Sequence, residues 1–358
     1  MEETGKKRFA AAGIVAAGIA YFLVCAYPLP KELVLVPLWT RSLSQAPSAP
    51  AARKAQTEAP IPFRLGESYG YFTQDGSLLF AAPQGYGVAL AADAFAPYDR
   101  LSEGFAIESP EGRTLAKVSA VGYPFFASGR RFVLAPDQAG VSELGPGGSV
   151  AWTYRFSSPA TSFDASPAVA AFGLVDGSIV GLDRSGQAVL DFAPGGSRIA
   201  GVYGVAVSPD GLLVAAVTGL DRQRLVVMEK RSTAYRVAYH RYLSSDYRRA
   251  IFIGFTADGR LLEFESPSGV GVYDRATRSE SVIPVPTAFK LGLAARDGRL
   301  LVLLSGEGET RRLVCAELPD RRVLDVEIQA KQAFVEARGD SLFLGVDDDL
   351  VRMDLKER

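Results

Sequence analysis

Two residue types that commonly build catalytic sites are scarce in this chain of 358 residues. It contains no asparagine, and its single histidine is His240. The single histidine excludes a metal site built on several histidines and leaves only His240 as a possible member of a Ser-His-Asp triad. The absence of asparagine also removes every N-glycosylation acceptor and leaves Asp-Gly or Gly-Gly for the tight turns that elsewhere use Asn-Gly.

Cysteine and net charge are low as well. Cys25 and Cys315 are the only cysteines, and Cys25 lies in an apolar N-terminal segment, so we expect no disulfide framework. A formal net charge of -1 gives no global reason to expect a nucleic-acid partner. The common phosphate-loop, zinc-protease, redox and nucleophile-elbow motifs are missing too. We therefore expect no catalytic site, no metal and no cofactor.

The N-terminus carries a membrane-targeting pattern. Three basic residues, Lys6, Lys7 and Arg8, precede an uncharged and mostly apolar run from Phe9 to Tyr27. As a helix this run would span about 28 Å, close to a hydrocarbon core of about 30 Å. We predict a cytoplasmic tail over residues 1–8 and an uncleaved, single-pass anchor over residues 9–28. A cleaved signal peptide, a lipoprotein modified at Cys25 and a buried helix are the alternatives.

The predicted anchor also sets the expected location and the next segment. The basic cluster places the short N-terminal side in the cytoplasm, so the bulk of the chain would lie in the periplasm, tethered to the inner membrane. Residues 29–64 read as a juxtamembrane segment and linker. The run "KELVLVPLW" is too short to span a bilayer, and Ser42 to Pro62 is rich in Ala, Pro and Ser, which is typical of a semi-stiff spacer.

Residues 65–358 repeat one pattern. Short runs rich in Val, Leu, Phe and Ala are bounded by Gly, Pro, Asp and Ser, which is typical of many antiparallel strands. Asp-Gly pairs at 176–177, 210–211, 258–259 and 297–298 recur at spacings of 34, 48 and 39 residues. A period near 40 with four strands indicates a β-propeller blade. We expect each Asp-Gly pair to form a two-residue hairpin turn with positive φ.

The number of repeats predicts an all-β propeller of seven four-stranded blades. First strands would start near Leu78, Gly122, Pro167, Val202, Ala250, Lys290 and Gln332. The last unit has only three strand-like runs, so we expect the strand Ser68 to Gly76 to supply the fourth and close the ring, which would leave no open sheet edge. Six or eight blades remain open, because the segment Gln84 to Lys117 is irregular.

One repeat carries a family resemblance. A Trp-bearing strand, a Pro-Ala-Val run, an Asp-Gly turn, an apolar-Leu-Asp strand and a Gly turn resemble a PQQ-like repeat, here Trp152, Pro167 to Val169, Asp176-Gly177, Gly181 to Asp183 and Ser185-Gly186. The stretch Val205 to Val217 is similar to the strand-turn-strand of WD-repeat propellers. Only one blade carries the Trp, and neither an adjacent Cys pair nor an acidic metal-ligand set is evident. The resemblance therefore implies architecture without a bound quinone.

One segment is a candidate partner-binding surface. Between Glu229 and Ala250 the chain concentrates Tyr and Arg, the types enriched at interface hot spots. The candidates are Tyr235, Arg236, Tyr239, Arg241, Tyr242, Tyr247, Arg248 and Arg249. The alternative is an outer strand on which Tyr and Arg alternate because strand faces alternate. Pro194 to Gly201 and Asp347 to Asp349 suggest a phosphate loop and a calcium site, but a blade connection and a solvated turn explain them more simply.

These observations favour a non-enzymatic, monomeric scaffold that binds protein partners. A PQQ-like propeller tethered to a membrane looks like the accessory factors of outer-membrane protein assembly, which implies a role in cell-envelope assembly or in a membrane complex. The alternative is a ligand-binding sensor, or a propeller hydrolase or lyase, that uses the central funnel. Three or four converging carboxylates would favour the enzyme, whereas an apolar or Tyr/Arg rim would favour a partner surface.

Overall fold

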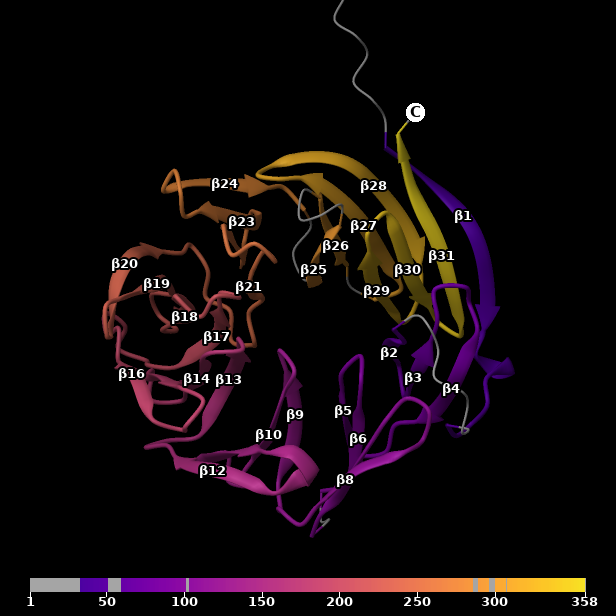
Figure 1. The fold of residues 1–358 in the computed structure, drawn as a ribbon. Helices are drawn as coiled ribbons and strands as arrows, with labels where there is room; N and C mark the ends of the chain where they lie inside the picture. The colour runs from indigo at the N-terminus through magenta and orange to yellow at the C-terminus, as the bar shows by residue number, and fades with distance from the viewer. Residues whose placement is uncertain are drawn as a thin grey trace, which may run out of the picture. The chain divides into compact units, whose positions relative to one another are not determined.

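The computed structural model describes residues 33–50, 59–100, 103–285, 289–295, 300–306 and 308–357, the segment 289–295 by its backbone only. The chain divides into two compact units. The first, Met1–Val34 with Lys356–Arg358, is described only where it holds the ends of two strands. The second, Leu35–Leu355, contains the repeated sheets, and Figure 1 shows them following one another around a common centre.

The described residues form eight antiparallel sheets, and therefore an eight-bladed all-β propeller. Seven sheets have four strands and one has three. In chain order the first four sheets are β2 (Ile61–Leu65), β3 (Ser68–Phe72) and β4 (Leu78–Pro83); β5 (Gly87–Leu90), β6 (Phe95–Tyr98), β7 (Phe105–Glu108) and β8 (Thr114–Val118); β9 (Tyr123–Ala127), β10 (Arg130–Leu134), β11 (Gly140–Leu144) and β12 (Val150–Arg155); and β13 (Ala160–Ala165), β14 (Ala170–Leu174), β15 (Ile179–Leu182) and β16 (Ala188–Phe192).

The remaining four sheets, like the first four, run from an inner first strand to an outer last strand (Figure 1). They are β17 (Val202–Val207), β18 (Leu213–Thr218), β19 (Arg224–Arg231) and β20 (Ala234–Tyr242); β21 (Ile253–Phe255), β22 (Leu261–Ser266), β23 (Gly269–Asp274) and β24 (Ser279–Ile283); β25 (Phe289–Ala295), β26 (Leu300–Ser305), β27 (Thr310–Glu317) and β28 (Arg321–Gln329); and β29 (Ala333–Arg338), β30 (Ser341–Val346), β31 (Asp349–Glu357) and β1 (Leu33–Ser42). Two short 3-10 turns are η1 (Leu43–Gln45) and η2 (Pro146–Gly148).

The predicted count of seven blades is wrong. Five predicted starts lie within a few residues of a first strand, namely Gly122, Val202, Ala250, Lys290 and Gln332. The predicted start Pro167 is wrong, because it lies beside β14, the second strand of its sheet. The error in the count lies before residue 120, where the predicted unit starting at Leu78 contains both β4, the last strand of the first sheet, and all of the second sheet, β5–β8. The strands β5–β8 are only four or five residues long, and β6 pairs with β7 at the single position Phe95–Glu108. Such short strands leave too little alternation for a sequence pattern to reveal.

The strand that completes the last sheet also differs from the prediction. An N-terminal strand does join it, but that strand is β1, which pairs with β31, and not the segment Ser68–Gly76. Ser68–Phe72 is instead the middle strand, β3, of the three-stranded sheet. The apolar run "LVLVPLW", expected beside a membrane, is therefore part of the propeller.

The predicted membrane anchor is not retained. Within the part of the chain that the structure describes, no helix has the length and apolar character needed to cross a membrane. The predicted segment, residues 9–28, lies outside the described residues. This finding contradicts the predicted transmembrane helix and the inner-membrane, periplasmic location that depended on it.

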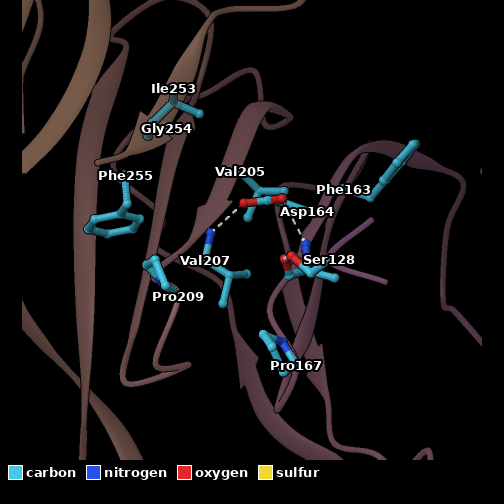
Figure 2. A pocket seen from close by; sticks show the side chains of 11 residues that line it. Ser128, Phe163, Asp164, Pro167, Val205, Val207, Pro209, Ile253, Gly254 and Phe255 are labelled. Atoms are coloured by element: carbon cyan, nitrogen blue, oxygen red, sulfur yellow. Dashed lines mark hydrogen bonds between the residues drawn. The ribbon is translucent and has the colours of Figure 1, made fainter. Parts of the chain in front are cut away.

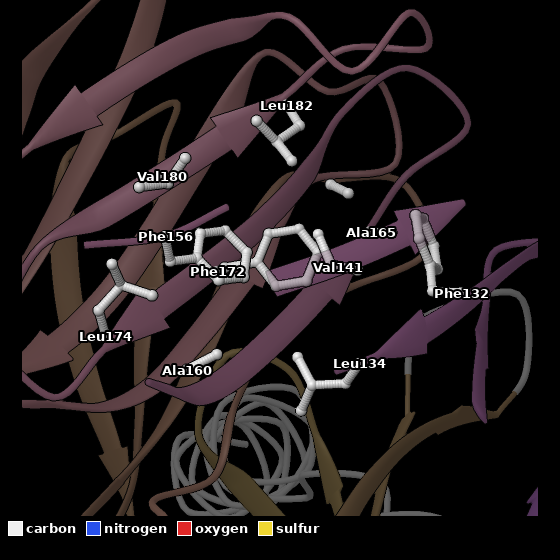
Figure 3. Close-up of a cluster of buried hydrophobic side chains, with 11 residues drawn as sticks. Phe132, Leu134, Val141, Phe156, Ala160, Ala165, Phe172, Leu174, Val180 and Leu182 are labelled. Atoms are coloured by element: carbon white, nitrogen blue, oxygen red, sulfur yellow. The ribbon is translucent and has the colours of Figure 1, made fainter. Parts of the chain in front are cut away.

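The hydrophobic cores lie between neighbouring sheets. In β14 the side chains of Phe172 and Leu174 pack against Phe132 of the preceding sheet, whereas Ala171 packs with Val205 of the following sheet. Figure 3 shows the first of these clusters, with Phe172 beside Phe156. Because successive residues of a strand point to opposite faces, a sheet covered on both sides needs apolar residues at every position. This explains the unbroken apolar runs in the sequence.

The Asp-Gly pairs that are described form turns, but not of the predicted type. Only the glycine has positive φ, at +88° in Gly177, +69° in Gly211 and +68° in Gly259. The aspartate before each glycine accepts the N–H two residues further on, as Asp210 does from Leu212 at 2.9 Å. The predicted two-residue turn needs positive φ at both of its central residues. A longer turn that ends in a left-handed glycine also reverses the chain between two strands, and it needs positive φ only at that glycine. The fourth pair, Asp297-Gly298, lies outside the described residues.

The two tryptophans make the same contact at different places in the ring. Trp152 on β12 donates its indole N–H to the carbonyl of Arg184 at 3.1 Å, and its ring covers Gly186 in the β15–β16 turn. Trp39 on β1 donates to the carbonyl of Gln74 at 3.1 Å and covers Gly76 in the β3–β4 turn. Each outer strand is thereby attached to the following blade, so the last sheet contacts the first in the way that β12 contacts its neighbour.

Candidate functional site

The predicted Tyr/Arg segment occupies the periphery. Its first part is β20, the outermost strand of its sheet, and its second part connects β20 to β21 (Figure 1). The expected outer-strand position is therefore correct. Whether the segment binds a partner depends on which of its side chains are free.

The tyrosines of β20 are used within the fold. The Tyr235 hydroxyl donates to the carbonyl of Gly211 at 2.6 Å, and burial, with a contribution from Asp210, raises the pKa of Tyr235 to about 12. The Tyr239 ring stacks on Tyr273 with centroids 4.2 Å apart, and its hydroxyl donates to Glu280 at 2.7 Å. Tyr235 thus contacts its own blade, whereas Tyr239 links it to the next.

A bulge explains why these two tyrosines serve different faces. Residues four apart on a regular strand share a face. In β20 the register with β19 shifts, so that Met228 faces Val237 and the adjacent Val227 faces Tyr239. The extra residue turns the strand over, as a β-bulge does. A simple alternation of faces could not have predicted this arrangement.

The arginines of the segment are mostly paired. Arg241 forms an ion pair with Glu280, and Arg249 forms a two-pronged pair with the fully buried side chain of Glu265. Tyr242 lies under a guanidinium from outside the predicted set, that of Arg222, at 4.2 Å. These contacts hold the outer strand and its connection in place.

Two arginines of the segment have a different environment. Arg236 is exposed on β20 opposite Glu229, and Arg248 is exposed in the connection to β21. Arg248 lines a cavity of about 340 Å³ together with Arg249, Tyr203 and Thr161. The remaining candidate is Tyr247. Its backbone N–H donates to the Gln223 side-chain oxygen, and its carbonyl accepts from the Gln223 side-chain nitrogen. The structure therefore does not bring the eight candidates together into one surface.

A larger cavity lies along the innermost strands, and none of its lining residues was among the predicted site residues. Its volume is about 680 Å³, and we call it the inner-strand pocket. The lining comes from four consecutive sheets: Ser128, Phe163, Asp164, Ala165, Pro167, Val205, Val207, Pro209, Ile253, Gly254 and Phe255. Figure 2 shows the carboxylate of Asp164 between Val205, Val207 and Ser128, with the Phe163 ring turned away from it. Because several blades contribute, the pocket exists only in the assembled ring.

The walls of the inner-strand pocket are mainly apolar. Val205 and Val207 are buried in β17, whereas Pro167 and Pro209 are exposed in the turns that follow β13 and β17. Phe163 is 41% exposed, and its centroid lies 3.8 Å from that of Phe125. Together with Pro167 and Pro209 it leaves several exposed apolar side chains at the edge of one cavity, the kind of surface that a partner or ligand covers.

Asp164 is the only charged residue among the described residues that line this pocket. Its Oδ2 accepts the Val207 N–H at 2.8 Å, across the boundary between two blades, and its Oδ1 accepts the Ala165 N–H at 2.8 Å. Burial raises the pKa of the Asp164 carboxyl above its ordinary value, although the two N–H donors act in the opposite direction. The carboxylate is therefore held in a fixed position in a partly dry environment.

The neighbouring blade is attached at the same place. The Ser128 hydroxyl in the β9–β10 turn donates to the carbonyl of Ala165 at 2.6 Å. Together with the bond from Asp164 to Val207, this links three successive blades beside the pocket. The pocket wall is thus positioned by side-chain contacts that cross between sheets, which makes it a preformed site.

The weaker sequence candidates lie in turns. Asp347 to Asp349 lie at the β30–β31 turn, where Asp347 has φ +52° and accepts the Gln332 N–H at 3.1 Å. Pro194 to Gly201 connects β16 to β17, and the side chain of Arg224 donates to the Pro194 carbonyl. In the described part of the chain, no group of three or more His, Cys, Asp or Glu side chains could hold a metal ion.

Sequence reasoning missed the inner-strand pocket because its residues are scattered over 128–255. One signal was available in "TSFDA", where a carboxylate interrupts an inner strand and would be costly to bury without a purpose. That signal marks Asp164, but it does not reveal which blades stand opposite. The partners of Asp164 follow only from the closed ring.

Comparison with known proteins agrees with the fold. A family model described as "beta-propeller protein" matches residues 1–358. An uncharacterised protein of Treponema pallidum (strain Nichols) is 30% identical over 344 residues, which cover 94% of this chain and 91% of that protein. The chain thus matches this relative over nearly the full length of both proteins.

Two solved structures show the same architecture at low sequence identity. BamB from Moraxella catarrhalis superimposes with a TM-score of 0.58 and 13% identity over 90% of this chain and 100% of that chain. The Dos1 propeller gives a TM-score of 0.59 and 11% identity over 89% and 95%. At such identities the likeness concerns the fold alone.

Proposed function

Since the chain belongs to the family of β-propeller proteins, we propose that it is a non-enzymatic scaffold, and that its protein partner inserts an apolar segment into the inner-strand pocket. The observation that carries this proposal is the pocket of about 680 Å³ walled by apolar side chains from consecutive blades. Concave, preformed and mostly apolar cavities are where proteins bind ligands and partner side chains.

The rim of the pocket supports a protein partner. Pro167 and Pro209 are exposed in neighbouring turns, and Phe163 presents much of its ring. Binding would remove this apolar surface from water without ordering the scaffold, because the wall is already connected by Ser128 and Asp164.

A site-specific photocrosslinker tests the proposal. We would place the photoreactive residue at Pro209, on the pocket rim, and at Leu212 as the matched control. Leu212 is 41% exposed three residues further along, outside the pocket lining. In the native cell we expect a discrete protein adduct at position 209 that is absent at position 212. No adduct at 209, or equal yields of the same adduct at both positions, would refute the proposal.

A ligand-binding sensor is the second candidate, and the pocket volume favours it. Cavities of about 300–1,000 Å³ are typical small-molecule sites. Native mass spectrometry of the purified chain distinguishes the two. A retained small molecule, together with the absence of protein adducts at position 209, would support the sensor over the scaffold.

A further inference from the structure

We infer that the inner-strand pocket selects a cationic group on an apolar stem, such as the side chain of a lysine or arginine in the partner segment. This inference rests on the proposed function, because it concerns what enters the same pocket. It is carried by the position of Asp164 in the cavity and by the nature of its bonding partners.

Asp164 has no cationic partner among the described residues, and unlike the equally unpaired Glu263, which is outside the pocket lining, it faces the cavity. Glu143 is paired with Arg130 and Arg184, and Glu265 with Arg249. An ionised carboxylate in a desolvated place is costly unless it is paired. In those two cases the protein supplies the cation itself, whereas beside Asp164 it supplies an open cavity.

The carboxylate retains capacity to accept more hydrogen bonds. Each of its oxygens accepts one backbone N–H, from Ala165 and from Val207. A carboxylate has about four acceptor sites, so both oxygens can accept again. The two backbone donors hold it in place without neutralising its charge. A ligand ammonium or guanidinium would find an oriented anion that needs no rearrangement.

The surrounding walls suit the stem of such a ligand. The wall beside Asp164 includes the aliphatic side chains of Val205, Val207 and Ile253, and Phe255 contributes an aromatic ring to the lining (Figure 2). The methylene groups of lysine and arginine pack well against such apolar walls. No lysine or arginine is among the described lining residues, so a cation entering the pocket meets no like charge there.

A pair of isosteric probes tests the inference on the full chain. We would measure the binding of 4-phenylbutylamine, protonated at neutral pH, and of the uncharged 4-phenylbutanol. The readouts are the dissociation constant and the amide NMR shifts of Ala165 and Val207, whose N–H groups donate to Asp164. We expect the amine to bind on the order of 10-fold more tightly, with the largest shifts at these two amides.

Charge changes on the rim provide variants that leave Asp164 intact. Pro209 is exposed in a turn at the pocket rim, so Pro209→Arg should weaken amine binding several-fold and Pro209→Glu should strengthen it. Pro209→Gln is the neutral control, and relative to it Pro209→Arg should lower, and Pro209→Glu should raise, the ratio of amine affinity to alcohol affinity. Asp164→Asn should remove the preference for the amine. If this variant fails to fold, the Pro209 series still decides the question.

The outcomes separate this inference from the proposed function. Equal affinity for amine and alcohol, or shifts that avoid Ala165 and Val207, would refute the cation preference and leave an apolar binding site. The absence of a protein adduct at position 209 in the crosslinking experiment would instead refute the scaffold proposal.

Discussion

The buried ion pair between Arg130 and Glu143 offers the sharpest test of how the blades are joined. Arg130 is 3% exposed and Glu143 5%, and two parallel bonds of 2.8 and 2.7 Å connect them. Arg130 also donates to the carbonyl of Ser166 in the next blade at 3.3 Å, and Arg184 adds a bond of 2.9 Å to Glu143. Removing Arg130 would therefore leave a desolvated carboxylate with one largely exposed partner.

We expect Arg130→Met to lower the free energy of unfolding by about 3 kcal/mol. Breaking a buried pair from one side typically costs about 3–5 kcal/mol, and the remaining Arg184 places this case at the lower end. The double variant Arg130→Met/Glu143→Leu removes both charges and should recover most of the loss, to within about 1 kcal/mol of the natural chain.

Urea unfolding followed by tryptophan fluorescence measures these changes, because Trp152 lies 6.3 Å from Phe132, on which the Arg130 guanidinium stacks. The matched control is Arg155→Met, which breaks an exposed pair with Asp137 and should cost less than about 1 kcal/mol. If Arg130→Met costs no more than Arg155→Met, the argument that burial makes this pair essential is refuted.

Three further predictions concern the pH dependence of stability, a turn and the ring closure. Burial raises the pKa of Glu263 from 4.5 to about 8, so between these values the folded chain holds a proton that the unfolded chain has lost. Its contribution to stability should therefore fall as pH rises, by at most about 5 kcal/mol, and Glu263→Gln should abolish this fall in urea titrations from pH 5 to 8.5. Gly186→Ala should lower the melting temperature, because φ at this position is +79° and a Cβ would lie 2.6 Å from the Trp152 ring. An unchanged melting temperature would contradict the inference that Trp152 holds β12 against the β15–β16 turn. Because Trp39 is only partly buried, Trp39→Ala should lower the free energy of unfolding by less than the roughly 3–5 kcal/mol typical of a core tryptophan. Proteolysis of this variant should release β1 before the other strands, and simultaneous cleavage elsewhere would count against closure by β1.

Much of the fold was predictable because it is local. The Asp-Gly pairs mark turns wherever they are described, and the apolar runs from Val202 onward correspond to strands. Both features depend on neighbouring residues: a left-handed glycine suits a tight turn, and an apolar strand suits a sheet that is covered on both faces. The blade count failed where strands were too short to show alternation, as between Gln84 and Lys117.

The candidate site was less predictable because it is not local. The segment around β20 stood out by composition, yet Tyr239 and Arg241 are engaged by Glu280 of the next blade. A composition rich in Tyr and Arg describes an interface equally well whether it lies between two proteins or between two blades. Only the structure distinguishes these cases.

The sequence by itself determined that this protein repeats a four-stranded antiparallel unit, since turns and strand periods are short-range properties of the chain. Only the tertiary structure decided that the described residues form eight sheets, that β1 joins the last one, and that Asp164 faces a cavity built by several blades. The reason is physical: a pocket between blades depends on which residues stand opposite one another after the ring closes, and contacts so distant along the chain leave no local pattern in the sequence.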